Sequence, residues 1–126
     1  MLALAEMQLT TTGQPAAVQF DLWQQMVADA FTPVTLSRAD DAEGNGFRSA
    51  VQARRLGDLA LSWLTSEAQT VDRTSDLIRA RPSGHYFLNL VLRGCGSAVQ
   101  DGRVTTAHPG QFLLVDGDRP FTLDFG

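Results

Sequence analysis

The second half of the chain is a series of short apolar segments separated by turn signals. Segments of strand length recur at 86–92, 97–100, 104–107, 111–115 and 121–125. Asp101-Gly102 between two of them is a strong hairpin signal, because both central positions of a type I′ turn need a positive φ. Short strands at this regular spacing predict a β-barrel or jelly roll. Residues 86–92 are apolar on both faces, which predicts a strand that is covered on both sides.

The first half of the chain predicts one helix and then further strands. Pro15 suits a first helical turn, and Thr32-Pro33 ends the helix because proline disfavours the α conformation in the residue before it. Phe20, Trp23 and Val27 share one helical stripe, which predicts that the helix docks on a sheet. Strands are predicted at 47–55, 59–65 and 71–74.

The predicted organisation is a flexible N-terminal arm over 1–14 and a single domain over 15–126, with the helix packed outside a mainly β body. A chain of 126 residues has the size of one ordinary domain. The last predicted strand is still in progress at the end of the sequence, so the barrel is expected to be incomplete in this chain.

Charge and cysteine content limit the possible partners. The net charge is −4, and all ten basic residues are scattered arginines. A nucleic-acid-binding surface needs a dense positive face, so this segment is not expected to bind DNA by itself. A single cysteine excludes an internal disulfide, no apolar run is long enough to cross a bilayer, and no signal peptide is recognisable. These features predict a cytoplasmic protein with no membrane partner.

The residues that could carry catalysis are few and far apart. His85 and His108 stand alone and 23 positions apart, whereas a first-row metal site needs three or four ligands brought together. Cys95 lies between two glycines and is interpreted as a turn residue rather than a nucleophile. Asp116 and Asp118 are expected to accept hydrogen bonds from backbone amides of their loop. We therefore predict no catalytic residue, no metal ligand, no cofactor and no enzyme activity.

An ordered set of segments resembles the sensor domain of AraC/XylS-type transcription regulators, in the AraC-binding-like branch related to cupins. The segments are Tyr86–Gly94, Val99–Arg103, His108–Gln111 and Asp116 with Arg119–Phe121. The resemblance implies a cupin-like barrel or jelly roll that binds a small-molecule effector. It also implies a C-terminal DNA-binding unit of two helix-turn-helix motifs. That unit is absent from these 126 residues, so DNA would be contacted only through it.

Four residues are candidates for contacting the effector. Asn89 interrupts an apolar strand, and its amide either contacts a ligand or braces a neighbouring loop. Trp63 is either a pocket wall or a core residue, and Tyr86 has the same two interpretations. Arg81 either reaches the barrel mouth, where it would hold an acidic or hydroxylated effector, or is a solvated loop arginine.

Two other functions remain open at this point. One is a free-standing enzyme of the cupin superfamily, which would show a bound metal. The other is a cupin-like dimerisation module, in which the helix that carries Trp23 pairs with a second copy. A homodimer is also compatible with the sensor function.

Overall fold

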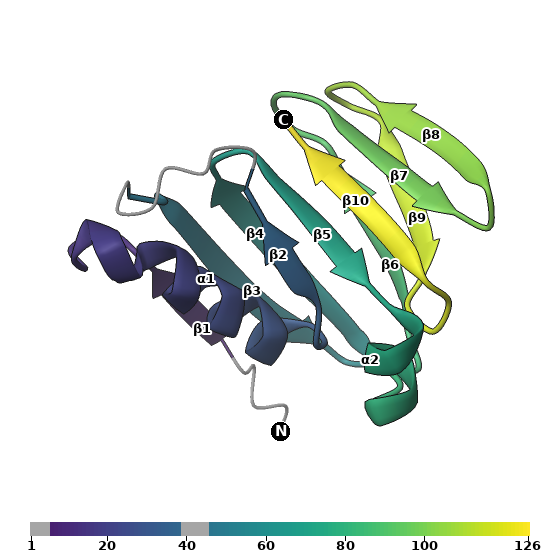
Figure 1. Ribbon diagram of the computed structural model, residues 1–126, viewed down its shortest axis with the longest axis horizontal. Coiled ribbons are helices and arrows are strands. Elements are labelled where there is room, and N and C mark those ends of the chain that lie inside the picture. The colour runs from purple at the N-terminus through teal and green to yellow at the C-terminus, as the bar shows by residue number, and fades with distance from the viewer. Residues whose placement is uncertain (1–5, 39–45) are drawn as a thin grey trace. The chain divides into compact units, whose positions relative to one another are not determined.

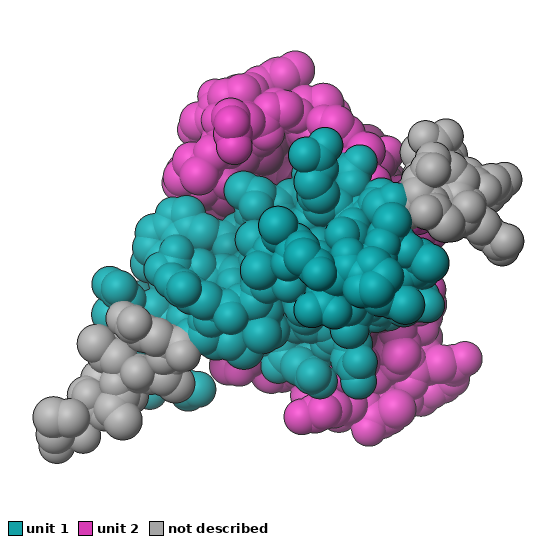
Figure 2. Space-filling model, turned by 90° about the vertical axis from the view of Figure 1, so that its left-hand side faces the viewer, with its two compact units in different colours: residues 1–30, 42–67 teal, residues 31–41, 68–126 magenta. Residues whose placement is uncertain are grey.

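The computed structural model describes residues 6–38 and 46–126 and is mainly β (Figure 1). The chain divides into two compact units, which are coloured separately in Figure 2. The first unit comprises residues 1–30 and 42–67, and the second comprises residues 31–41 and 68–126. The prediction of a mainly β fold with one N-terminal helix is confirmed. The sheets have three, five and two strands and are open, so the described residues form no closed barrel.

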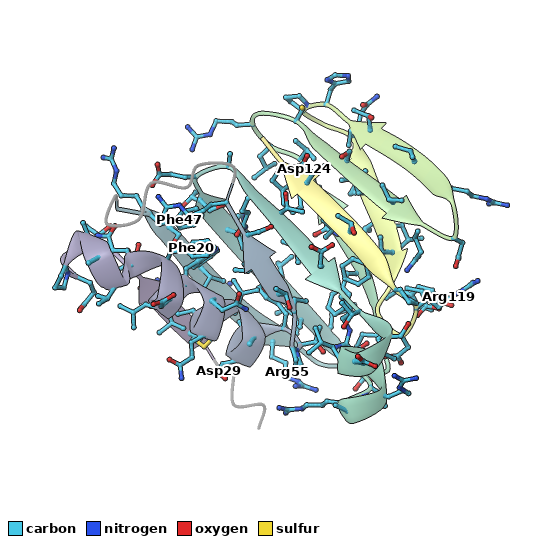
Figure 3. The ribbon with its side chains drawn as sticks, in the orientation of Figure 1. Phe20, Asp29, Phe47, Arg55, Arg119 and Asp124 are labelled. Atoms are coloured by element: carbon cyan, nitrogen blue, oxygen red, sulfur yellow. The ribbon has the colours of Figure 1, made fainter. Side chains whose placement is uncertain are left out.

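The first unit is a three-stranded antiparallel sheet with the long helix. Its elements are β1 (Glu6–Thr10), α1 (Ala16–Ala30), β3 (Ser49–Leu56) and β4 (Leu59–Ser66), and the strand order is β1-β3-β4. The helix begins directly after Pro15, and the predicted stripe is its inner face, because Trp23 and Val27 are buried. The ring of Phe20 meets Phe47 edge-on at 5.0 Å between centroids, as Figure 3 shows.

Buried polar bonds fix the start of α1 to the segment before β3. The Oε1 atom of Gln19 accepts from the backbone N–H of Phe47 at 2.7 Å, and its Nε2 donates to the carbonyls of Thr11 and Gln14. The hydroxyl of buried Thr11 accepts from the backbone N–H of Ser49 at 3.0 Å. A side-chain amide that satisfies backbone groups on both sides can be buried without a large desolvation cost.

The predicted arm over 1–14 contains a strand that the sequence analysis did not foresee. Residues Glu6–Thr10 form β1 and pair with β3 over the full length of β1. The alternation of Met7 and Leu9 with polar residues is compatible with a strand, but five residues are too short a window to separate a strand from a loop. Residues 1–5 lie outside the described residues.

The second unit contains a five-stranded and a two-stranded sheet. Its elements are β2 (Thr35–Ser37), β5 (Gln69–Arg73), α2 (Ser75–Ala80), β6 (Tyr86–Leu90), β7 (Gly96–Gln100), β8 (Arg103–Ala107), β9 (Phe112–Asp116) and β10 (Phe121–Phe125). The five-stranded sheet has the order β2-β5-β10-β7-β8, and β6 pairs with β9. All strand pairs are antiparallel. The strands predicted in this region are therefore confirmed to within a few residues.

The core of the second unit lies between its two sheets. One register row of the five-stranded sheet is buried across four of its strands, where it consists of Leu36, Val71, Leu123 and Ala98. Leu113 and Val115 of β9 are buried on the opposite side. A Cβ added to Gly96 of β7 would lie 3.1 Å from the side chain of Leu113, so the glycine allows the two sheets to approach closely.

Two details of the second unit test local sequence signals. Asp101 and Gly102 have φ values of 55° and 75°, which confirms the hairpin predicted between β7 and β8. Helix α2 was not predicted. Thr74 caps the start of this helix, because its hydroxyl accepts from the backbone N–H of Leu77. The helix has only six residues, too few to show the apolar periodicity by which longer helices are recognised in a sequence.

The prediction that the strand over 86–92 is covered on both faces is wrong. Along β6, Tyr86, Leu88 and Leu90 are exposed, and only the alternate residues Phe87 and Asn89 are partly buried. An apolar residue pattern shows that a surface is suited to burial, but it does not show that the same chain buries it.

Candidate functional site

Asn89 is the predicted site residue that the structure places closest to the core of the second unit. It lies on the inward face of β6 and is half-buried. Its Nδ2 reaches the carbonyls of Leu113 and Phe87 only at 3.4 and 3.5 Å, well beyond the usual length of an N–H···O bond. Among the described residues no donor reaches its Oδ1. This amide therefore has unused hydrogen-bonding capacity that a ligand could satisfy.

Arg73, at the end of β5, is a fully buried arginine. Its guanidinium donates to three backbone carbonyls, those of Gly117, Pro33 and Arg81, each at 2.8 Å. Three loops of the second unit are thereby joined at one point. Arginine suits this position because its planar group donates in several fixed directions while remaining charged.

Asp118 extends this cluster to the loop before β6. Its carboxylate accepts from the backbone N–H groups of Ser83 and Gly84 at 2.6 and 2.8 Å, and the Arg73 guanidinium lies 3.7 Å away. The backbone bond from Ser83, followed by that from Gly84, holds the pKa of Asp118 below its ordinary value of 3.8. The prediction that Asp116 and Asp118 accept from backbone amides of their own loop is confirmed for Asp116, which accepts from the backbone N–H of Asp118. Asp118 instead accepts from the loop before β6.

Sequence analysis did not single out Arg73. It lies two residues after the buried Val71 on the same strand, so the two-residue period of a strand places it on the inward face. This two-residue period could have identified Arg73 as an inward residue. It did not, because arginine is rarely buried and a charged residue at such a position is normally taken to mark the end of a strand.

The other three predicted site residues are exposed. Arg81 caps the C-terminal end of α2, and the Arg73 guanidinium contacts its backbone carbonyl rather than its side chain. Tyr86 is 71% exposed on the outward face of β6, whereas Asn89 faces inward. Trp63 lies in the first unit, on β4, and is 47% exposed. The second unit thus contains three of the four residues, and they do not share one face.

One hollow of the second unit is lined by both polar and apolar residues. It has a volume of about 400 Å³ and lies at the ends of β5, β7 and β10, where Asp72, Thr74, Ser75, Gln100 and Asp101 contribute to its lining. Sites for drug-sized ligands are mostly apolar with a few polar groups. Val99, Pro120 and Phe121 also contribute to the lining, so this hollow has such a mixture, but none of the four predicted site residues lines it.

The two histidines and the cysteine considered for catalysis are exposed. His85 and His108 lie in loops, and Cys95 precedes β7, where its backbone bonds with that of Gly126. Within 6–38 and 46–126, no three histidine, cysteine, aspartate or glutamate side chains gather as they would around a metal ion. The described residues likewise include no helix with the length and hydropathy required to span a bilayer.

Comparison with known proteins agrees with this architecture. The family model of the AraC-binding-like domain matches residues 23–126. The chain is 36% identical over 81 residues to the transcriptional activator NphR of Rhodococcus sp, a match that covers 64% of this chain and 22% of NphR. It is 25% identical over 107 residues to a protein of Bacillus sp. (strain OxB-1) named for the nit 5′ region, covering 85% of this chain and 40% of that protein.

A solved structure shows the same fold. The crystal structure of the AraC-like transcriptional activator CuxR superposes with a TM-score of 0.83 at 23% sequence identity, covering 96% of this chain and 46% of CuxR. The chain therefore spans less than half the length of each of these three proteins. Since the family model covers most of the sequence and spans both compact units, the chain belongs to the AraC-binding-like domain family, the N-terminal sensor domains of AraC-type transcription regulators.

Proposed function

We propose that this domain senses a small-molecule effector and thereby controls a DNA-binding segment that lies outside these 126 residues. The observation that carries the proposal is the family match over residues 23–126. The printed name of the relative NphR, a transcriptional activator, supports a regulatory role. The proposal includes no catalytic step and no cofactor. It places the protein in the cytoplasm, where a regulator reaches its promoters.

Asn89 is the residue we propose as the polar contact to the effector. Its two existing bonds are long, and its Oδ1 has no donor among the described residues. A ligand with one hydrogen-bond donor and one acceptor would satisfy the hydrogen-bonding capacity of this amide. The walls around it are apolar, since Phe87 precedes it by two residues on the same face and Leu113 is its partner on β9. A largely apolar ligand with one amide-like or hydroxyl edge fits these surroundings.

Arg81, Tyr86 and Trp63 remain proposed contacts with weaker support. The guanidinium of Arg81 is exposed and would suit a carboxylate on the effector. Tyr86 and Trp63 offer exposed aromatic surface. Substitution of each by alanine would show which of them contributes to effector affinity.

For the regulatory step, the effector must bind one conformation of the regulator more tightly than another. The Arg73 cluster is a suitable element to respond, because it joins the loops at Pro33, Arg81 and Gly117. A ligand that displaces one of these loops would affect the other two. DNA would be contacted only by the helix-turn-helix unit that the family implies.

Calorimetric titration of the 126-residue chain against a set of aromatic amides, hydroxylated aromatics and carboxylates tests the proposal. At least one saturable ligand is expected, and Asn89→Leu should weaken it by roughly tenfold to a hundredfold, the cost of leaving a polar ligand group unpaired. Gln52→Leu, which removes an exposed amide from β3, is the matched control and should leave the affinity unchanged. A folded chain that binds none of these compounds but converts one of them would contradict the proposal.

A further inference from the structure

The hollow at the ends of β5, β7 and β10 has the size of a small-molecule site. Its volume of about 400 Å³ lies within the range of about 300–1,000 Å³ that is usual for such sites. Part of it is the outward surface of the sheet, where Asp72, Thr122 and Val99 are register partners on three neighbouring strands. Its lining lies wholly within the second unit and does not include Asn89.

The lining carries one carboxylate whose charge is not compensated. Asp101 forms an ion pair with Arg119 at 2.9 Å. Asp72 accepts a hydrogen bond from the hydroxyl of Thr122 at 2.6 Å, and no basic side chain of the described residues forms an ion pair with it. Arg73 also borders the hollow, but its guanidinium is fully buried on the inward face, where it donates to three backbone carbonyls. The hollow therefore favours a ligand with positive charge.

Apolar surface lies at a defined separation from this carboxylate. Val99 is 40% exposed on the same outward row as Asp72, and Pro120 is exposed beside it in the lining. Asp72 and Val99 belong to β5 and β7, which flank β10 on either side. Two strand spacings place their backbones roughly 9–10 Å apart. An ammonium group about two carbons from an apolar group spans this separation once both side chains are included.

The base of the hollow is held by hydrogen bonds within the chain. The Oε1 atom of Gln100 accepts from the backbone N–H of Asp116 at 3.0 Å, and its Nε2 donates to the carbonyls of Asp116 and Arg119 at 2.9 and 3.2 Å. The hydroxyl of Thr74 accepts from the backbone N–H of Leu77. These bonds fix the segments that border the hollow, so a ligand would bind without ordering them first.

We propose that this hollow binds a small organic cation, a primary amine whose short chain ends in an apolar group. The ammonium donates to the carboxylate of Asp72, and such charge-assisted bonds are the stronger ones in proteins. The apolar end packs against Val99 and Pro120. A carboxylic acid of the same size is repelled by Asp72. The site is separate from the interior beside Asn89, so this proposal does not rest on effector binding there.

Titration of the 126-residue chain with phenethylamine, followed by two-dimensional amide NMR spectra, tests the proposal. Saturable shifts are expected at the amides of Asp72, Ser75, Val99 and Asp101, with a dissociation constant of roughly 1 mM for so small a ligand. Phenethyl alcohol has the same carbon skeleton without the charge and should bind about tenfold more weakly. Hydrocinnamate, which carries the opposite charge, should produce no saturable shift at these amides.

Two aspartates of the outward sheet face provide a matched pair of variants. Asp72→Asn keeps an oxygen that accepts from Thr122 but removes the charge, and it should raise the dissociation constant of phenethylamine about tenfold. Asp124 accepts in the same way from the hydroxyl of Thr70, at 3.4 Å, and Figure 3 shows it near the end of β10 opposite Arg119. Asp124→Asn should leave the dissociation constant unchanged.

A third variant blocks the hollow without removing any charge. Val99→Phe extends an aromatic ring from an exposed strand position and should abolish the shifts, while its amide spectrum shows whether the chain is folded. Asn89→Leu should leave the affinity for phenethylamine unchanged, which separates this proposal from that of the effector site. The proposal would be overturned by equal affinity for phenethyl alcohol, by equal effects of Asp72→Asn and Asp124→Asn, by shifts confined to Phe87 and Asn89, or by no saturable shift at all.

Discussion

The second unit has two outward sheet faces of opposite chemistry. On the five-stranded sheet, the outward positions are mostly serine, threonine and aspartate, among them Thr35, Ser37, Thr70, Asp72, Ser97, Thr122 and Asp124. These residues bond with one another, and the hydroxyl of Thr122 donates to Asp72 at 2.6 Å. Figure 3 labels Asp124 on this sheet. On β6 and β9, the outward positions are leucine and aromatic residues.

The two faces therefore interact differently with water. Ser, Thr and Asp on a sheet face retain their hydrogen bonds in water, so the five-stranded sheet needs no cover. On the outward face of β6 and β9, each Å² of apolar surface left in water costs roughly 25 cal/mol relative to burial. Both faces belong to sheets whose inward sides form the same core. The two faces therefore differ in how favourably they are hydrated, although they cover the same core.

The largest expected effect comes from the bonds that hold the core beneath both faces. Arg73→Met removes the donor for three loop carbonyls and leaves Asp118 without its arginine. We expect a loss of about 3–5 kcal/mol in the free energy of unfolding, measured by urea denaturation. Arg73→Lys keeps the charge but not the three directions of donation, and it should recover only part of the loss. Full stability of Arg73→Met would show that the loops are held by other contacts.

Two adjacent leucines of β9 sharpen the comparison of inward and outward faces. Leu113 is fully buried, and Leu114 is 62% exposed. Leu113→Ala should destabilise the fold by about 2–5 kcal/mol, because a cavity remains in the core. Leu114→Ala should change stability by less than about 0.5 kcal/mol at concentrations that keep the chain monomeric. Equal losses for the two variants would contradict the one-sided burial of this strand.

A smaller effect is expected from the polar face. Thr122→Val removes the bond to Asp72 but keeps a β-branched side chain that suits a strand. A loss of about 1 kcal/mol in the free energy of unfolding is expected, and thermal melting together with urea denaturation would measure it. If this change also promoted self-association, it would show that solvation of the polar face prevents contacts there.

The smallest effect depends on pH. Because the pKa of Asp118 is lowered in the folded chain, its contribution to stability is present above the unfolded value of 3.8 and is lost as the pH falls through the folded pKa. Asp118→Asn should therefore melt at a lower temperature than the unsubstituted chain at pH 7. The difference in melting temperature between the two chains should become smaller as the pH falls below about 4. If the difference in melting temperature stayed constant from pH 7 to pH 3, the loss of stability would come from packing rather than from the charge of the carboxylate.

The sequence predicts much of the fold but less of the site. The turn at Asp101-Gly102 and the strands around it follow from local backbone preferences, and the structure confirms them. Asn89 was identified because a polar residue in an apolar strand is a local anomaly. The exposure of Tyr86 and Leu88 could not be predicted, since whether an apolar face is covered depends on segments distant in sequence.

The most direct test of the central claim is cysteine labelling along β9 in a Cys95→Ser background. Cysteines placed singly at 112, 113, 114 and 115 would be treated with a maleimide. The account predicts fast labelling at 112 and 114 and slow labelling at 113 and 115, because the first two positions are exposed and the other two are buried. Uniform labelling along the strand would contradict it.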